Sequence, residues 1–122
     1  LQTGKAISEW HKSSEINKIY DTFFSILLEQ EREKNYKNCE NRFDEFIDKG
    51  AIEEVRYLKD KNFDRSLPGF KCLGVNWILK YLDKEISLND AIVLSKRDTR
   101  RYVKRQLTWF RHNFNPDLIL RI

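Results

Sequence analysis

The chain has 122 residues, of which 40% are hydrophobic and 13% aromatic, and its net charge is +4 at pH 7. This composition argues against disorder and allows one modest core, and every apolar run is far shorter than the roughly 18 residues of a membrane span. Cys39 and Cys72 show neither a CxxC spacing nor clustered histidines, which excludes a disulfide framework and the common zinc signatures. We therefore expect reduced thiols and a cytoplasmic protein with no membrane partner.

The first 30 residues predict a short helix around Trp10, with Ser8 as its N-cap, and one strand over residues 22–28. An almost unbroken apolar strand is typical of a parallel sheet covered on both faces, yet only residues 118–122 offer a second strand. A single strand leaves backbone groups unpaired, so we expect this one to be completed from outside, for example by a second copy of the chain. The absence of methionine likewise indicates a piece of a longer protein.

The rest of the chain predicts helices. Apolar residues recur at steps of three and four over residues 31–49, and Gly50 suits the left-handed position that ends such a helix. Two further helices are expected over residues 51–61 and about 73–82, separated by a loop with the turn pair Pro68-Gly69. The predicted fold class is mostly α with one or two short strands.

The last and longest helix is expected over about residues 88–112, because Ser87 and Asp90 form a capping box at its start. Within it, residues 95–111 hold seven basic side chains against one acid, so this stretch carries +6 and the rest of the chain sums to −2. At about 100° per residue the basic side chains share one half of the helix, whereas Trp109 and Phe110 fall on the other half. The basic residues are Lys96, Arg97, Arg100, Arg101, Lys104, Arg105 and Arg111.

Two interpretations of this helix stay open on charge alone. A solvated helix face is the simpler one. The shortage of acidic residues three or four positions away favours a contact with RNA or DNA, because soluble helices usually supply such partners. A free-standing helical RNA-binding module and a purely structural helical adaptor are therefore both compatible with the basic stretch.

Three motifs carry a family resemblance: RFDEFIDKGAIEEVR at residues 42–56, KCLG at 71–74 and TRRYVKRQLTWFR at 99–111. Their order and spacing resemble those of tRNA dimethylallyltransferases over residues 3–111. The resemblance implies a C-terminal fragment of a P-loop-like α/β enzyme with a helical insertion. Residues 1–30 would end the insertion and add a core strand, and residues 31–122 would form the C-terminal helical part with the tRNA-contacting helix.

The resemblance also implies an activity. Such an enzyme transfers a dimethylallyl group from dimethylallyl diphosphate to the N6 amine of the adenosine 3′ of the anticodon, which it flips into a channel. The whole enzyme is expected to be a monomer with an ATP-type nucleotide-binding P-loop and a Mg²⁺ ion. Because the P-loop, the catalytic aspartate and the metal ligands have no counterpart in this sequence, we expect the chain alone to be inactive.

The resemblance assigns roles to particular residues. Arg42 corresponds to the arginine that binds the prenyl diphosphate; the alternative is a surface arginine paired with Glu31 or Glu45. Val75 and Asn76 replace the family's usual tyrosine and basic residue, so other residues would have to supply a stacking or phosphate contact there. The expected tRNA contacts are Lys71, Cys72, Leu73, Gly74, Val75, Asn76, Lys104, Arg105, Gln106, Leu107, Thr108, Trp109, Phe110 and Arg111.

Within residues 104–111, Lys104 and Arg105 are the expected phosphate contacts, with Arg111 on the same face. Gln106 and Thr108 are expected to hydrogen-bond near the flipped nucleotide, although Gln106 lies on the apolar half and would alternatively tie helices together. Trp109 and Phe110 fit a core position better than a stacking platform.

Overall fold

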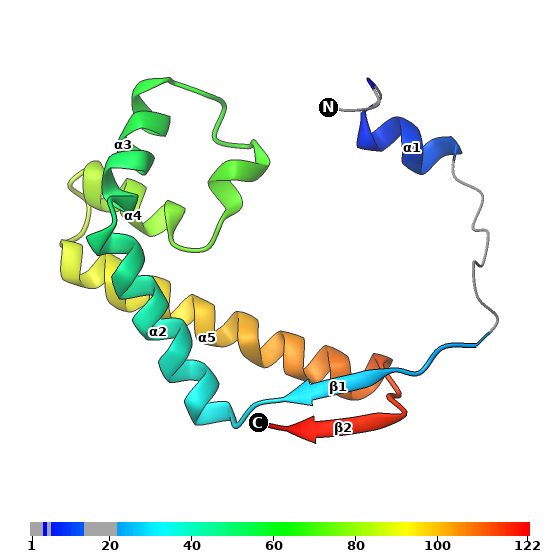
Figure 1. Cartoon of the computed structure of the whole chain (residues 1–122). Helices are drawn as coiled ribbons and strands as arrows, with labels where there is room; N and C mark the ends of the chain where they lie inside the picture. Colours follow the sequence, from blue (N-terminus) through cyan, green and yellow to red (C-terminus); the bar gives the residue numbers. More distant parts are fainter. Residues whose placement is uncertain (1–3, 5, 14–21) are drawn as a thin grey trace.

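The computed structural model describes residues 4, 6–13 and 22–122. The elements follow the order α1 (Ile7–Ser13), β1 (Ile26–Glu29), α2 (Arg32–Asp48), α3 (Ala51–Asp60), the 3₁₀ helix η1 (Pro68–Lys71), α4 (Val75–Leu82), α5 (Leu88–Asn113) and β2 (Leu118–Arg121) (Figure 1). The predicted, mostly helical fold with two short strands is confirmed. None of the helices in the described ranges is long and apolar enough to cross a membrane.

The helix ends follow local signals, with one exception. Ser87 caps α5, because its hydroxyl accepts the backbone N–H of Asp90 at 3.1 Å and donates to that residue's carboxylate at 2.6 Å. Gly50 has φ of +100° after the end of α2, as predicted. The predicted N-cap at Ser8 is wrong: α1 begins at Ile7, and the N–H groups of Glu9 and Trp10 donate to the carbonyl of Ala6.

The main apolar core lies where α3, η1 and α4 meet. Val55, Phe70, Ile78 and Leu79 are buried together there. Within α4, Ile78 and Leu79 are buried, whereas Trp77 is only half-buried. This core fixes the position of residues 71–76, which connect η1 to α4.

A second packing seam runs along α5, where the buried positions recur every four residues: Ala91, Ser95, Thr99 and Val103. The two buried hydroxyls donate back to the helix, from Ser95 to the carbonyl of Ala91 at 2.7 Å and from Thr99 to that of Ser95 at 3.0 Å. These small, internally satisfied residues let α2 and α4 approach α5 closely. The buried positions of α5 therefore lie on the half opposite the basic side chains, as predicted, and two of them are the small polar residues Ser95 and Thr99.

The two strands pair with each other. β1 and β2 form a parallel two-stranded sheet in the register Ile26 with Leu118 through Glu29 with Arg121. The second strand that the sequence offered, at residues 118–122, supplies this partner, so the expectation that the strand at residues 22–28 is completed from outside is wrong. The strand itself begins at Ile26 rather than at residue 22. Residues 22–25 precede the pairing, which starts where Asp117 accepts hydrogen bonds from the backbone N–H and hydroxyl of Ser25, both at 2.7 Å.

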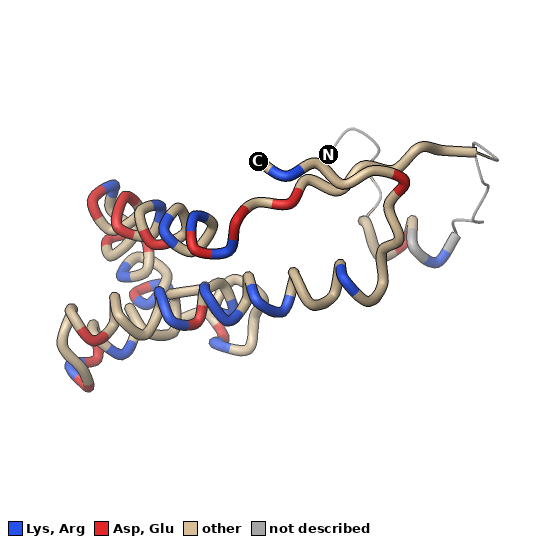
Figure 2. Tube along the Cα trace, turned by 90° about the horizontal axis from the view of Figure 1, so that it is seen from below, with Lys and Arg blue, Asp and Glu red and all other residues tan. Residues whose placement is uncertain are grey.

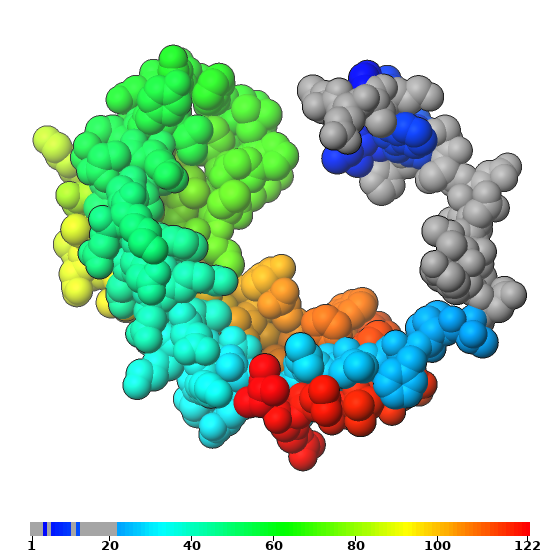
Figure 3. Space-filling view, viewed as in Figure 1, coloured from blue at the N-terminus to red at the C-terminus, as the bar shows by residue number. Residues whose placement is uncertain are grey.

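The sheet is not covered on both faces by the described residues. Leu28 is 61% exposed, its neighbour Leu120 is 42% exposed, and both strands lie open at the surface in the space-filling view (Figure 3). The apolar character that predicted a doubly covered strand therefore corresponds, in this chain, to exposed apolar surface.

Candidate nucleic-acid interface

Lys and Arg recur along α5 (Figure 2), and their side chains divide into two groups with different surroundings. In the first group, Lys96 lies 2.6 Å from a carboxylate oxygen of Asp44, and Arg100 pairs with Glu40. Both carboxylates belong to α2, one helix away. The interpretation that acidic partners are lacking is therefore wrong for this group, because packing supplies partners that local spacing does not show.

Asp98 neutralises part of the same group. One of its oxygens lies 3.4 Å from the Nε of Arg97 and 3.5 Å from a terminal nitrogen of Arg101. Its other oxygen accepts the indole N–H of Trp77, in α4, at 2.8 Å. The first group of cations is thus engaged within the protein and braces α5 against α2 and α4.

The second group, Lys104, Arg105 and Arg111, is exposed. Among the described residues none of the three has a carboxylate oxygen within 4.0 Å, in contrast with the first group. The guanidinium carbon of Arg105 lies 5.6 Å from the centre of the Tyr102 ring, which holds it along the helix surface. Unpaired cations on a rigid helix are suited to bind phosphates.

Two of these cations border a surface groove of about 380 Å³. Its lining is formed by Lys104, Arg105, Thr108, Trp109, His112 and Asn113. Arg111 lies instead at the rim of the neighbouring cavity described below. Sequence reasoning missed His112 and Asn113, because they follow the recognised motif, although their spacing from Thr108 and Trp109 places them on the same helix face.

Trp109 offers this groove an aromatic surface. Its side chain is 55% exposed and Phe110 is 38% exposed, so the core position predicted for both is wrong in the described part of the chain. The Trp109 ring meets Phe110 edge to face at 5.2 Å, and Phe110 meets Phe114 in the same way at 5.8 Å. A half-exposed aromatic ring beside cations is suited to stack on a base.

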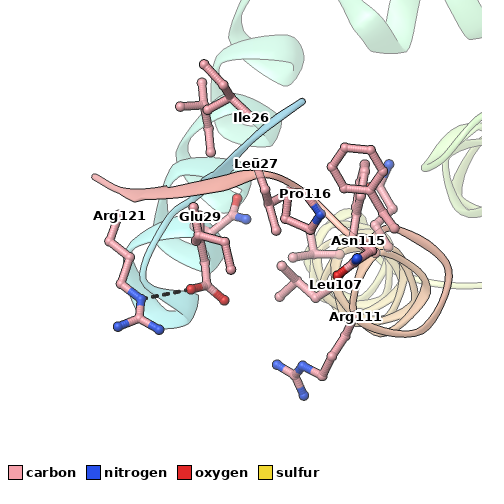
Figure 4. A pocket seen from close by; sticks show the side chains of 15 residues that line it. Ile26, Leu27, Glu29, Leu107, Arg111, Asn115, Pro116 and Arg121 are labelled. Carbon is pink, nitrogen blue, oxygen red and sulfur yellow. Dashed lines mark hydrogen bonds and ion pairs between the residues drawn. The ribbon is translucent and has the colours of Figure 1, made fainter. Parts of the chain in front are cut away.

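A larger cavity, of about 750 Å³, lies between α5 and the β pair. Figure 4 shows Leu107, Asn115 and Pro116 on the α5 side, and the ion pair of Glu29 with Arg121, at 3.0 Å, on the strand side. Gln106 also lines this cavity. Gln106 and Leu107 thus face away from the groove that Lys104 and Arg105 border.

Residues 71–76 reach the surface at both ends and are fixed in the middle. Lys71, Cys72, Leu73 and Asn76 are exposed, and Val75 is half-buried. Gly74 is buried with φ of +92°, and a Cβ at this position would lie 2.7 Å from the ring of Phe43. Exposed side chains therefore lie on both sides of Gly74, whose own position is fixed by packing against Phe43.

Arg42 is exposed on α2 and pairs with neither Glu31 nor Glu45. Its guanidinium carbon lies 6.0 Å from the centre of the Phe46 ring, and Glu45 pairs with Lys49 at 3.1 Å. Nothing in the described part of the chain gathers three metal-ligating side chains, and the Mg²⁺ expected for the whole enzyme stays a prediction.

Comparison with known proteins places this geometry in a family. A family model described as IPP transferase matches residues 1–113. The tRNA dimethylallyltransferase of Alkaliphilus oremlandii (strain OhILAs) is 44% identical over 114 residues, which are 93% of this chain and 36% of that protein. That of Wolbachia pipientis wMel is 39% identical over 113 residues, which are 93% of this chain and 38% of that protein.

Solved structures agree. The tRNA delta(2)-isopentenylpyrophosphate transferase of Staphylococcus epidermidis superposes with a TM-score of 0.74 at 29% identity, covering 98% of this chain and 38% of that one. The full-length tRNA isopentenylpyrophosphate transferase of Bacillus halodurans superposes with a TM-score of 0.71 at 34% identity, covering 81% of this chain and 31% of that one. The chain spans about a third of the length of the relatives it matches. With nearly all of its residues matched by the family model, the chain belongs to the IPP transferase family.

Proposed function

We propose that this chain is the tRNA-contacting part of a tRNA dimethylallyltransferase. The enzyme would transfer the dimethylallyl group of dimethylallyl diphosphate to the N6 amine of the adenosine 3′ of the anticodon, in the cytoplasm. The observation that carries the proposal is the groove on α5, where Lys104 and Arg105 have no carboxylate partner among the described residues and Trp109 is half-exposed. Cations beside an open aromatic ring are the usual means of holding an unpaired RNA loop.

In this proposal the residues of the chain bind and orient rather than react. Lys104 and Arg105 hold phosphates of the anticodon stem-loop, Trp109 stacks on an unpaired base, and Lys71 adds a further cation from the 71–76 stretch. Arg42 takes the diphosphate of the donor. Mg²⁺ and the ATP-type P-loop would have to be supplied by other parts of the whole enzyme, which we propose to be a monomer.

The test is the salt dependence of binding to an anticodon stem-loop RNA. Lys104→Ala combined with Arg105→Ala is expected to weaken binding and to lower the slope of log K against log salt by about two, one unit for each phosphate that is no longer neutralised. The matched control is Lys96→Ala with Arg100→Ala, which removes the same charge from the same helix. Because these two residues are paired with α2, the control should lower stability and leave most of the slope intact.

Equal slopes for the two double variants would contradict the groove, since that result would mean that only the overall charge matters. A wild-type affinity that ignores salt would contradict RNA phosphate contacts altogether.

A further inference from the structure

Residues 71–76 and residues 104–111 lie on different elements and have to meet one RNA molecule in a fixed relation. α4 begins at Val75, so the orientation of the 71–76 stretch depends on how the first turn of α4 is held against α5. Trp77 is the third residue of α4, and its indole N–H donates to Asp98 of α5 at 2.8 Å. This bond joins α4 to α5 one residue after the first candidate contact stretch and six residues before the second.

Asp98 is the only acidic residue in residues 95–111, which also hold seven basic residues. Both of its oxygens are used, one by Trp77 and the other by Arg97 and Arg101. The Trp77 ring also lies 5.8 Å from the guanidinium carbon of Arg97 and 5.5 Å from the amine of Lys80. The indole is therefore held at its nitrogen by a half-buried carboxylate and flanked by two cations, which leaves it little freedom to reorient.

The position of Asp98 along α5 links this contact to the groove. Asp98 and Arg105 are seven residues apart, which is nearly two helical turns and places them on the same face, about 10 Å apart along the axis. On the other side of the bond, Gly74 is packed on Phe43 three residues before Trp77. Gly74, inside the 71–76 stretch, and Trp77, directly after it, are thus two fixed points of this segment.

We propose that Trp77 and Asp98 are positioning residues for tRNA: their hydrogen bond sets where Lys71 and its neighbours lie relative to the Lys104–Arg105 groove, so that both stretches contact one stem-loop at once. The inference rests on the proposed function. It gives the lone acid of the basic stretch a role that charge neutralisation alone does not explain, since neutralisation requires no partner on α4.

The first measurement needs no RNA. Spin labels would be placed on the exposed Cys72 and on Val93→Cys, an exposed position early in α5, with Cys39→Ser removing the other thiol. Trp77→Phe keeps an aromatic ring but removes the N–H donor together with part of the indole, and it is expected to broaden the distribution of distances between the labels. Asp98→Asn keeps an oxygen acceptor for the indole and is expected to keep the distribution narrow.

The matched control is Asp83→Asn at the far end of α4. Asp83 is also a half-buried carboxylate, and it holds Lys59 at 2.8 Å and Arg65 at 3.3 Å, remote from both contact stretches. Its loss should lower stability without broadening the distances. A distribution that stays narrow in Trp77→Phe, or that broadens equally in Asp83→Asn, would overturn the inference.

The second measurement is affinity for the anticodon stem-loop. In the wild-type background Lys71→Ala should weaken binding several-fold and lower the salt slope by about one. In the Trp77→Phe background Lys71→Ala should have almost no further effect, because the stretch is no longer held at the RNA, whereas Lys104→Ala should keep its full effect. An unchanged cost of Lys71→Ala in both backgrounds would overturn the positioning role.

The two measurements separate this inference from the proposed function. If Lys104→Ala fails to weaken binding in any background, the proposed function fails. If the label distances nevertheless broaden in Trp77→Phe, the hydrogen bond between Trp77 and Asp98 holds the two helices together without a role in RNA binding. The inference would then also fail, but the distance measurement would show that the bond itself was correctly described.

Discussion

Gly74 is the residue at which three helices meet. It directly precedes α4, its α-carbon faces the ring of Phe43 from α2, and the hydroxyl of Ser95 from α5 lies 3.6 Å from where a Cβ would be. Its φ of +92° lies in the left-handed region, which side chains other than glycine's adopt only with strain. A single backbone position therefore limits how closely α2, α4 and α5 pack.

We predict that Gly74→Ala lowers the free energy of unfolding by about 1–3 kcal/mol, from backbone strain and from displacement of a buried ring. Urea unfolding followed by circular dichroism would measure it. Gly69→Ala is the control, because no described atom lies within 4 Å of the place its Cβ would take and its φ is not in the left-handed region. Equal unfolding midpoints for the two variants would show that Phe43 moves aside at no cost.

At the scale of elements, the β pair depends on hydrogen bonds between Ser25 and Asp117, which are 92 positions apart and which we call the Ser25–Asp117 clip. Asp117 accepts from the N–H and hydroxyl of Ser25, and its own N–H donates to the Ser25 carbonyl at 3.0 Å. The Ser25 backbone N–H, followed by the Ser25 hydroxyl, lowers the pKa of the Asp117 carboxyl below its ordinary value. The charged carboxylate is therefore the form that the folded strand pair favours.

The lowered pKa of Asp117 predicts how the strand pair responds to pH. Because the folded pKa is lowered, the clip contributes fully above the ordinary aspartate pKa and is lost as the pH falls below about 4 through the folded value. The NMR shifts of the β1 and β2 amides should change in that range before those of α5. Asp117→Asn should remove the transition and weaken the pairing at neutral pH; strand amides that stay unchanged in the wild type under acid conditions would contradict the clip.

The sequence predicts individual elements better than it predicts their contacts, and the reason differs from element to element. The helix that starts after Ser87 was predictable because its cap is local, and Gly50 was predictable because φ above zero favours glycine. Residues 118–122 were recognised as the one further strand, but their pairing with β1 was not predicted, because a parallel pair joins distant segments that leave no short-range signal. Of the buried positions on α5, Ser95 and Thr99 were missed because they look polar until their hydroxyls are seen to bond within the helix.

At the scale of the whole molecule, net charge and charge placement answer different questions. The sequence predicts that the cations concentrate near the C-terminus, and the family motif predicts which of them contact tRNA. The sequence does not predict that Asp44 and Glu40 pair with Lys96 and Arg100, because these ion pairs depend on the packing of α2 against α5. Long-range packing thus separates structural cations from available ones within a single helix.

The exposed sheet leads to a prediction for the isolated chain. Leu28 and Leu120 are register partners with open apolar side chains, and within the described ranges each strand pairs along one edge only. We predict that the chain associates with itself at high concentration and that Leu28→Lys with Leu120→Lys reduces this association. Sedimentation velocity over a range of concentrations would measure it. Val93→Lys, at an exposed apolar position on α5, is the control and should leave the association unchanged, whereas a double variant that associates like the wild type would exclude the sheet as the contact.

The pairing of β1 with β2 also orders events in time. The bond from Ser25 to Asp117 closes a loop of 92 residues, so its entropic cost is met only after the helices between the strands have formed their own local contacts. On a ribosome, the last residues of β2 emerge after the whole of α5. The cationic groove can therefore be assembled while the sheet is still open, and completion of the sheet is a late step in the maturation of the chain.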